Sequence, residues 1–412
     1  MDVIVERGCG LDVHKETVVA CLCVGAAGQL ARKETRTFGT TTPDILALSD
    51  WLQEAQCTHV AMESTGVYWK PLYNLLEGQF TLLVVNAQHV KALKGHKTDV
   101  QDAEWLADLL RHGLLKRSFI PSADLRALRD LTRYRTTLVQ DRTRYVNRLQ
   151  KVLEDANIKL ASVASNVVGA SGRAMLAALV AGETDPETLA ELAQGRLQAK
   201  HAALSKALQG RLRPHHTFMV SELLMQIDNL DEAVARVSNE IAQRLASERD
   251  NLDRLDGIPG VNTRIAEVIL AEIGSEMSRF ESADDLASWA GMCPGNHESA
   301  GKRLSGKTRK GSRWLRTSLC EAAHGAARKK GCYLAAFYHR LVGRRGKKRA
   351  LVAVGHAILI SVYHMLKRKE AYKDLGSSYF DERNRNTVVR HSVKRLEKLG
   401  FTVTLTPQAI PA

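Results

Sequence analysis

The sequence predicts an α/β domain at the N-terminus, a helical arm after it and a mainly helical C-terminal domain. Short apolar runs separated by polar turns fill residues 3–38, a pattern typical of strands. Apolar residues later recur every seven positions in two stretches, which is typical of long paired helices. The chain has 412 residues, too many for one hydrophobic core, so two or three domains are expected.

The charge of the chain points to its class of partner. Hydrophobic residues make up 44% of the chain and charged residues 25%, as in ordinary soluble proteins, but the net charge of +14 indicates a polyanionic partner. Nucleic acid is the first candidate and a membrane surface the second. Gly355 and two histidines interrupt the most apolar late stretch, so no membrane span is expected. The seven cysteines show no CxxC spacing, and charged residues near the start argue against a signal peptide. Together these observations predict a cytoplasmic protein.

The N-terminal domain is expected over residues 1–123. Turn residues separate three strands in hairpin order, and helices then alternate with strands. This is the element order of the ribonuclease H fold. The strands are expected at 4–13, 17–24, 29–38, 59–63 and 81–85, and the helices at 42–55, 66–76 and near 89–93.

A further helix of this domain is expected to begin near Thr98 and to continue through Leu110. Thr98 with Gln101 three residues later has the form of a capping box. Asp99 and Asp102 then lie in the first turn, on one face of the helix. Acidic residues also complement the dipole at that end, so this pair alone does not indicate catalysis.

Two more carboxylates end predicted strands. Asp12 ends the first strand and Glu63 ends the fourth. These strands are neighbours in a ribonuclease H-like sheet, so both side chains are expected above the sheet together with Asp99 and Asp102. Hard oxygen ligands suit Mg²⁺, and two ions roughly 4 Å apart can activate a nucleophile and stabilise the leaving oxygen of a phosphodiester. The four acids are therefore predicted to hold Mg²⁺, with two ions per site.

Residues 124–251 are predicted to form an antiparallel coiled-coil arm for oligomerisation. Leu131, Leu138, Tyr145 and Val152 recur every seven residues in the first helix, and similar rows return after residue 218. Two long helices packed within one domain are the alternative. The other faces of the first helix carry many arginines, which either contact phosphates or are simply solvated.

The C-terminal domain, expected over residues 252–376, contains two features typical of nucleic-acid binding. The stretch around Ile258-Pro259 has the form of a helix-hairpin-helix element, whose amides can hold a phosphate without reading sequence. Residues 302–316 contain seven Lys or Arg and no acid, as contact with a phosphate backbone requires. The nucleic-acid-binding residues are predicted to be Gly257, Gly260, Lys302, Arg303, Lys307, Arg309, Lys310 and Arg313.

Ser299 is the candidate nucleophile of this domain. It lies among small residues and cations, where arginine and lysine would neutralise a phosphate and glycine would let the backbone approach. A basic loop rich in Ser and Gly is more often only a binding loop, and Ser305 and Ser312 are competitors in the same stretch.

Five motifs in order give the sequence a family resemblance. They are Gly-Leu-Asp-Val-His-Lys at 10–15, Ala-Met-Glu-Ser-Thr-Gly at 61–66, Lys-Thr-Asp-Val-Gln-Asp-Ala at 97–103, Ile-Pro-Gly-Val at 258–261 and Glu-Ser-Ala-Gly-Lys-Arg at 298–303. Together they resemble the DEDD-type insertion-sequence transposases, recombinases with a RuvC-like N-terminal domain that are guided by a bridge RNA. The resemblance covers residues 5–370, and the tail at 377–412 has no assigned role.

The resemblance implies a role for each site residue. Asp12, Glu63, Asp99 and Asp102 would be the metal ligands, and Ser299 would form a covalent phosphoserine intermediate, with the two sets acting in one composite site. It also implies a coiled-coil dimer pairing into a tetramer, double-stranded donor and target DNA, and a structured guide RNA in a nucleoid-associated bacterial protein. A Holliday-junction-resolving or repair endonuclease using water, and a basic scaffold without catalysis, are the alternatives.

Overall fold

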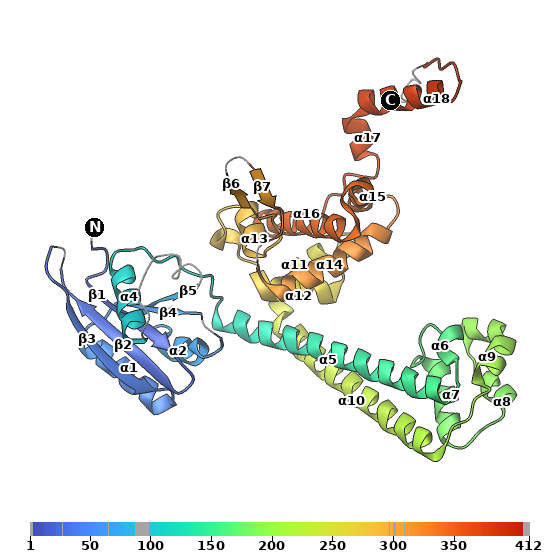
Figure 1. Cartoon of the computed structure of the whole chain (residues 1–412), viewed down its shortest axis with the longest axis horizontal. Coiled ribbons are helices and arrows are strands. Elements are labelled where there is room, and N and C mark those ends of the chain that lie inside the picture. The colour runs from blue at the N-terminus through green and yellow to red at the C-terminus, as the bar shows by residue number, and fades with distance from the viewer. Residues whose placement is uncertain are drawn as a thin grey trace. The chain divides into compact units, whose positions relative to one another are not determined.

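A computed structural model of the chain describes residues 3–26, 28–64, 66–86, 99–295, 297–299, 302–308 and 310–406. It contains two compact units, Met1–Ala123 and Asp124–Ala412. The first unit is mixed α/β and the second is mostly helical (Figure 1). The expected fold class is therefore confirmed at this level, and the first unit is compatible with a RuvC-like domain.

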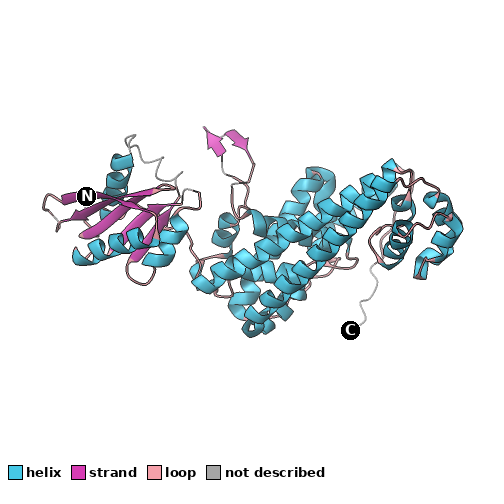
Figure 2. Cartoon of the chain, turned by 90° about the horizontal axis from the view of Figure 1, so that it is seen from below, coloured by secondary structure: helices cyan, strands magenta, loops and turns pink. Residues whose placement is uncertain are grey.

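The first unit is built on a five-stranded sheet in the order β3-β2-β1-β4-β5. Figure 2 shows this sheet in magenta. The first three strands pair antiparallel as a meander, whereas β4 lies parallel to β1 and β5 parallel to β4. The expected neighbourhood of the first and fourth strands is thus confirmed. The strands are β1 (Arg7–Val13), β2 (Thr17–Val24), β3 (Arg32–Gly39), β4 (His59–Glu63) and β5 (Thr81–Val85).

Helices cover both faces of this sheet, because the buried strands carry apolar residues on both sides. On one face, α1 (Thr42–Glu54) and α2 (Trp69–Leu76) pack against Leu11, Val18 and Met62. On the other, α4 (Asp99–Arg111) packs Ala103 and Ala107 against the alternate residues of β2. The helix expected near 89–93, and Thr98 at the expected start of the next helix, lie outside the described residues. The first strand and the second helix each start three residues later than expected.

Two long helices open the second unit. The helices α5 (Ala123–Asp155) and α10 (Pro214–Arg244) lie side by side, and Arg142 of α5 donates hydrogen bonds to both carboxylate oxygens of Asp231 of α10 (Figure 1). Between them in sequence, short helices build a core around Met175, Leu176 and Leu204 that also includes Leu153 of α5 and Val220 of α10. These are α6 (Leu160–Val163), α7 (Ala170–Val180), α8 (Pro186–Glu191), η1 (Gly195–Lys200) and α9 (His201–Leu208).

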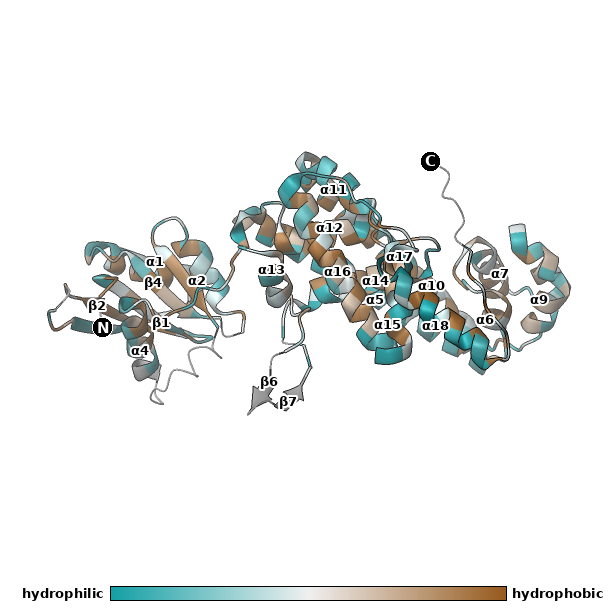
Figure 3. Ribbon diagram, turned by 90° about the horizontal axis from the view of Figure 1, so that it is seen from above, coloured by the Kyte–Doolittle hydropathy of each residue, from teal (hydrophilic) through white to brown (hydrophobic). Residues whose placement is uncertain are grey.

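The remainder of the second unit packs around α16 (Lys347–Arg368). This helix is long and apolar enough to cross a membrane by length and composition, yet more than half of its most apolar window is buried in the unit. Hydrophobic residues concentrate on it and on α12 in Figure 3. It is therefore the core helix of this region. The other elements of this region are η2 (Ala246–Glu248), α11 (Arg249–Asp256), α12 (Thr263–Ile273), η3 (Met277–Arg279), α13 (Ala283–Trp289), α14 (Arg313–Arg328) and α15 (Tyr333–Arg345).

The loop at 291–316 differs from what the sequence predicts, and the C-terminal tail had no prediction. The expected loop at 291–316 contains a short hairpin, β6 (His297–Ser299) paired with β7 (Lys302–Ser305), which no apolar alternation announces. The tail forms α17 (Tyr379–Arg383) and α18 (Arg385–Lys398). The ring of Phe380 stacks on that of Tyr333, with centroids 5.2 Å apart, which anchors α17 to α15.

Candidate active site

Asp12 and Glu63 end two paired parallel strands. Leu11 of β1 is in register with Met62 of β4, so the two acids are the next residues along the two strands. Because parallel strands run in the same direction, their carboxyl ends meet at one edge of the sheet. The pairing of β1 with β4 therefore brings the backbones of the two acids together.

Both acids point to the face of the sheet that α4 covers. Leu11, Val13 and Met62 belong to the core under α1 and α2. Side chains alternate along a strand, so Asp12 and Glu63 point the other way. Val85, the partner of Glu63 on β5, packs on Leu106 and Leu109 of α4 and confirms this assignment of the face.

Glycines of β1 set the position of α4. A Cβ on Gly8 would contact the side chain of Leu110, and one on Gly10 would contact the backbone of Ala103 and Ala107. Moving from Gly8 to Gly10 along the strand thus follows α4 backwards, toward its N-terminus. The next residue on this face is Asp12, and the direction leads toward the first turn of α4.

That first turn contains the other two acids. The backbone of Asp99 opens α4, while its side chain lies outside the described part of the structure. Asp102 is exposed one turn later. Hard carboxylate oxygens at one edge of a sheet are the donors that a divalent cation such as Mg²⁺ prefers, so the residues present fit such an ion.

His14, which the sequence reasoning placed beside Asp12 but not among the metal ligands, forms a contact with Asp12 that was not predicted. Its Nε2 lies 2.9 Å from Oδ2 of Asp12, whose side chain is only 18% exposed. The sequence signal that could have indicated this contact is that His14 follows Asp12 by two residues at the end of the strand. Lys15, by contrast, is exposed and lies beside Glu16.

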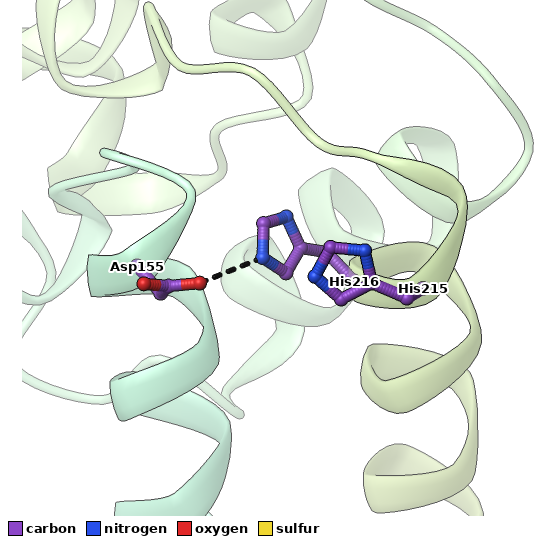
Figure 4. Close-up of side chains that lie close together, drawn as sticks. All are labelled: Asp155, His215 and His216. Carbon is purple, nitrogen blue, oxygen red and sulfur yellow. Dashed lines mark hydrogen bonds and ion pairs between the residues drawn. The ribbon is translucent and has the colours of Figure 1, made fainter.

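One group of metal-ligating residue types lies elsewhere. Within the described side chains, which do not include that of Asp99, Asp155 with His215 and His216 is the group whose ligand atoms approach closely enough to share an ion (Figure 4). The Nδ1 atom of His216 accepts the Arg213 backbone N–H, and its Nε2 lies 2.8 Å from Asp155. The ring proton therefore sits on Nε2 and is donated to Asp155, so His216 links the end of α5 to the start of α10.

Ser299 lies at the turn of the β6–β7 hairpin. It pairs with Lys302, and Glu298 pairs with Arg303. Only the backbone is described for these residues, and Ala300, Gly301 and Arg309 lie outside the described part. Lys307, Lys310 and Arg313 are exposed.

The two glycines predicted to bind phosphate differ in their surroundings. Gly260 has a φ of +87°, and a Cβ there would lie 2.1 Å from the carbonyl oxygen of Ala322 in α14. Gly260 therefore permits close packing of the turn on α14, a role that the sequence reasoning missed. Gly257 is exposed, and a Cβ there would meet only the Arg254 carbonyl oxygen at 3.2 Å.

Comparison with known proteins identifies the family. A family model for the DEDD transposase of IS110, described as Transposase, matches residues 9–158, which include all four acids. A second model, described as Transposase IS116/IS110/IS902 family, matches residues 252–339, which include Ser299. The chain belongs to this transposase family. The resemblance inferred from the motifs is confirmed, and the enzyme is a DNA transposase.

Curated relatives agree along most of the transposase. The transposase for insertion sequence element IS1111A of Coxiella burnetii is 25% identical over 70% of this chain and 72% of its own length. A probable family 20 transposase of Pseudomonas aeruginosa is 24% identical over 88% of this chain and 94% of its own. A putative transposase of Sinorhizobium fredii is 25% identical over 84% and 79%.

Proposed function

We propose that this transposase cuts and rejoins DNA with two sets of groups. Asp12, Glu63, Asp99 and Asp102 hold Mg²⁺, two ions per site, and Ser299 is the nucleophile. The observation that supports the metal site best is the pairing of β1 with β4, which ends in Asp12 and Glu63 on the face covered by α4. When bound, the ions would supply Lewis-acid polarisation of the scissile phosphodiester.

The acidic residues of the first unit act by keeping negatively charged carboxylates in fixed positions for the metal ions. Their carboxylates must stay ionised to bind a hard cation, and their strands fix the spacing of Asp12 and Glu63. His14 donates to Asp12 and so restrains its orientation. The helix α4, which carries Asp102, is packed closely against β1 at Gly8 and Gly10 and is thereby held in place.

Ser299 performs the covalent step. Its Oγ forms a bond to phosphorus while the bond from phosphorus to the 3′ oxygen breaks. The serine proton ends on the departing oxygen, which gives a 3′-hydroxyl and a phosphoserine. Attack by the 3′-hydroxyl of another strand reverses these steps, joins the strands and returns the proton to Ser299. Lys302 and Arg303, on the facing strand of the hairpin, neutralise the phosphate.

The proposal includes two kinds of partner. A structured guide RNA binds together with double-stranded donor and target DNA, which is supported by the net charge of +14 and by the family resemblance. The paired helices α5 and α10 join subunits into dimers that pair as tetramers. A discrete RNA that co-purifies with the transposase and restores cleavage of a matching duplex would support the RNA-guided part.

Strand exchange by single variants tests the chemistry. Asp102→Ala and Ser299→Ala are each expected to abolish recombination while DNA and RNA binding survive. Asp108→Ala, which removes a half-buried acid paired with Lys33 two turns further along α4, and Ser305→Ala, on the facing hairpin strand, are matched controls that retain activity. Full strand exchange by Asp102→Ala or Ser299→Ala would overturn the proposal.

A further inference from the structure

A cavity of about 240 Å³ lies between α5, α12 and α14 of the second unit. It belongs to neither the carboxylate edge nor the β6–β7 hairpin. Four arginines line it, together with one tryptophan and one glutamate. These are Arg133, Arg135, Arg264, Arg313, Trp314 and Glu321.

Two of the arginines form the wall of the cavity. Arg135 is 4% exposed and donates to Glu267 at 2.6 Å. Arg133 donates from Nε and Nη2 to the two oxygens of Glu272, at 2.8 and 3.0 Å. These pairs fix α5 against α12 and neutralise the guanidinium groups, so the wall is rigid.

The other two arginines supply the charge. Arg264 and Arg313 are exposed, and neither forms an ion pair with an acid among the described residues. Glu321 is the carboxylate on this lining. Asn262 caps α12 and Ser312 caps α14, so the positive ends of two helix dipoles lie beside these arginines. The mouth of the cavity therefore favours an anion.

Trp314 adds a flat apolar surface next to that charge. The indole is half-buried, and the guanidinium carbons of Arg313 and Arg133 lie 5.3 and 5.9 Å from its centroid. Nucleobases stack on aromatic rings and on guanidinium planes. A base stacked within a duplex cannot enter such a cavity, whereas an unpaired base can.

We propose that this cavity holds one unpaired nucleotide of a nucleic-acid strand. Its phosphate lies against Arg264 and Arg313, and its base stacks on Trp314. The inference rests on the proposed function only in that the ligand is nucleic acid. An unpaired nucleotide of DNA and one of RNA share this chemistry, and the two arms of the test distinguish them.

Binding of labelled oligonucleotides to the full chain tests the proposal. Fluorescence anisotropy compares a short oligothymidylate, an oligouridylate and a DNA duplex. Trp314→Leu is expected to weaken binding of at least one single strand about tenfold. Replacement of Arg264 and Arg313 together by glutamine should lower the slope of log K against log salt by about 0.7, the value for one neutralised phosphate of a single strand. Arg236→Gln, on an exposed arginine of α10, is the matched control that leaves binding unchanged.

Two further measurements separate a lost site from a lost fold. Trp314→Phe keeps an aromatic ring and should retain most of the single-strand affinity. An oligonucleotide carrying 5-iodouracil should crosslink on irradiation to the α14 peptide that contains Trp314. Wild-type single-strand affinity of the Trp314→Leu variant, an equal loss for the duplex, or crosslinks confined to other peptides would each overturn the proposal.

The outcome is independent of the serine chemistry. Ser299→Ala should bind the single strands like the wild type, so a failure of the proposed covalent step leaves this test intact. A loss for oligothymidylate alone assigns the cavity to DNA, and a loss for oligouridylate alone assigns it to RNA. Either result supports the nucleotide site.

Discussion

Gly10 of β1 lies so close to Ala103 of α4 that a Cβ on the glycine would sit 2.2 Å from the Ala103 carbonyl oxygen. The same Cβ would lie 2.5 Å from the backbone nitrogen of Ala107. Because both atoms are backbone, no side-chain rotation can relieve the overlap. The helix that carries Asp99 and Asp102 is therefore seated on the sheet by the absence of a side chain at Gly10.

Gly10→Ala is expected to displace α4 and to reduce both stability and activity. Overpacking of this kind costs about 3 kcal/mol, which thermal unfolding would detect as a lowered Tm. Gly343→Ala is the control, since a Cβ there has open space within a helix and should stabilise the chain by about 0.5 kcal/mol. A Gly10→Ala transposase with unchanged Tm and full strand exchange would show that α4 does not depend on this contact.

Glu272 anchors α5 to the rest of the second unit. It is 1% exposed, accepts two hydrogen bonds from Arg133 and a third from Oγ of Ser312 at 2.9 Å. Burial lowers the pKa of the neighbouring Arg129 to about 10, and the charge of Glu272 opposes this change. Arg129 thus stays charged at neutral pH, and its burial depends on Glu272 for compensation.

Glu272→Ala should therefore destabilise the second unit strongly. Loss of one partner of a buried ion pair costs about 3 kcal/mol or more, because the remaining charges stay buried. The half-exposed pair of Glu240 with Arg244 is the comparison, and Glu240→Ala should cost less than about 1 kcal/mol. Urea unfolding midpoints measure both, and equal shifts would contradict the anchoring role.

The two glycines of the turn between α11 and α12 should respond differently to alanine. Gly260→Ala should destabilise the chain, since its φ of +87° strains alanine and its Cβ overlaps the backbone of α14. Gly257→Ala should fold normally, because its φ is −64° and its surroundings are open. DNA binding by Gly257→Ala, measured beside its Tm, is thus the clean test of a phosphate contact. Unchanged affinity would remove Gly257 from the nucleic-acid-binding set.

His356 of α16 should make the fold sensitive to acid. Burial lowers its pKa, against a smaller opposing effect of Asp284. Below a pH of about 6.5 the unfolded chain takes up a proton that the folded chain resists, so stability falls as the pH falls. His356→Gln should flatten the decline of Tm between about pH 7 and pH 5. The exposed His364 is the control, and a His356→Gln curve parallel to that of the wild type would exclude this origin.

Sequence reasoning reached the sheet because its strands carry their own pattern. Strands β2, β4 and β5 have the expected bounds, since apolar runs between turn residues are visible along the chain. The nearness of Asp12 and Glu63 needed one further step, the pairing of β1 with β4 that the element order implied. That step is confirmed by the register, whereas the roles of the acids remain a prediction.

The missed features depend on contacts between distant residues. The sequence around Gly260 does not predict that Gly260 packs against Gly325 of α14. The β6–β7 hairpin has no apolar alternation, because it is short and mostly polar. The contact of His14 with Asp12 could not be predicted from the sequence, because two polar residues near a turn can each bond to several other groups.

A covalent protein–DNA adduct is the most direct test of the proposed chemistry. The transposase would be incubated with Mg²⁺, its nucleic-acid partners and a nicked DNA substrate that cannot be rejoined, and then digested for mass spectrometry. A nucleotide attached to the peptide at Ser299, and lost in both Ser299→Ala and Asp12→Asn, is the predicted result. Cleaved DNA without an adduct, whose new phosphate contains oxygen from isotopically labelled water, would contradict the serine mechanism.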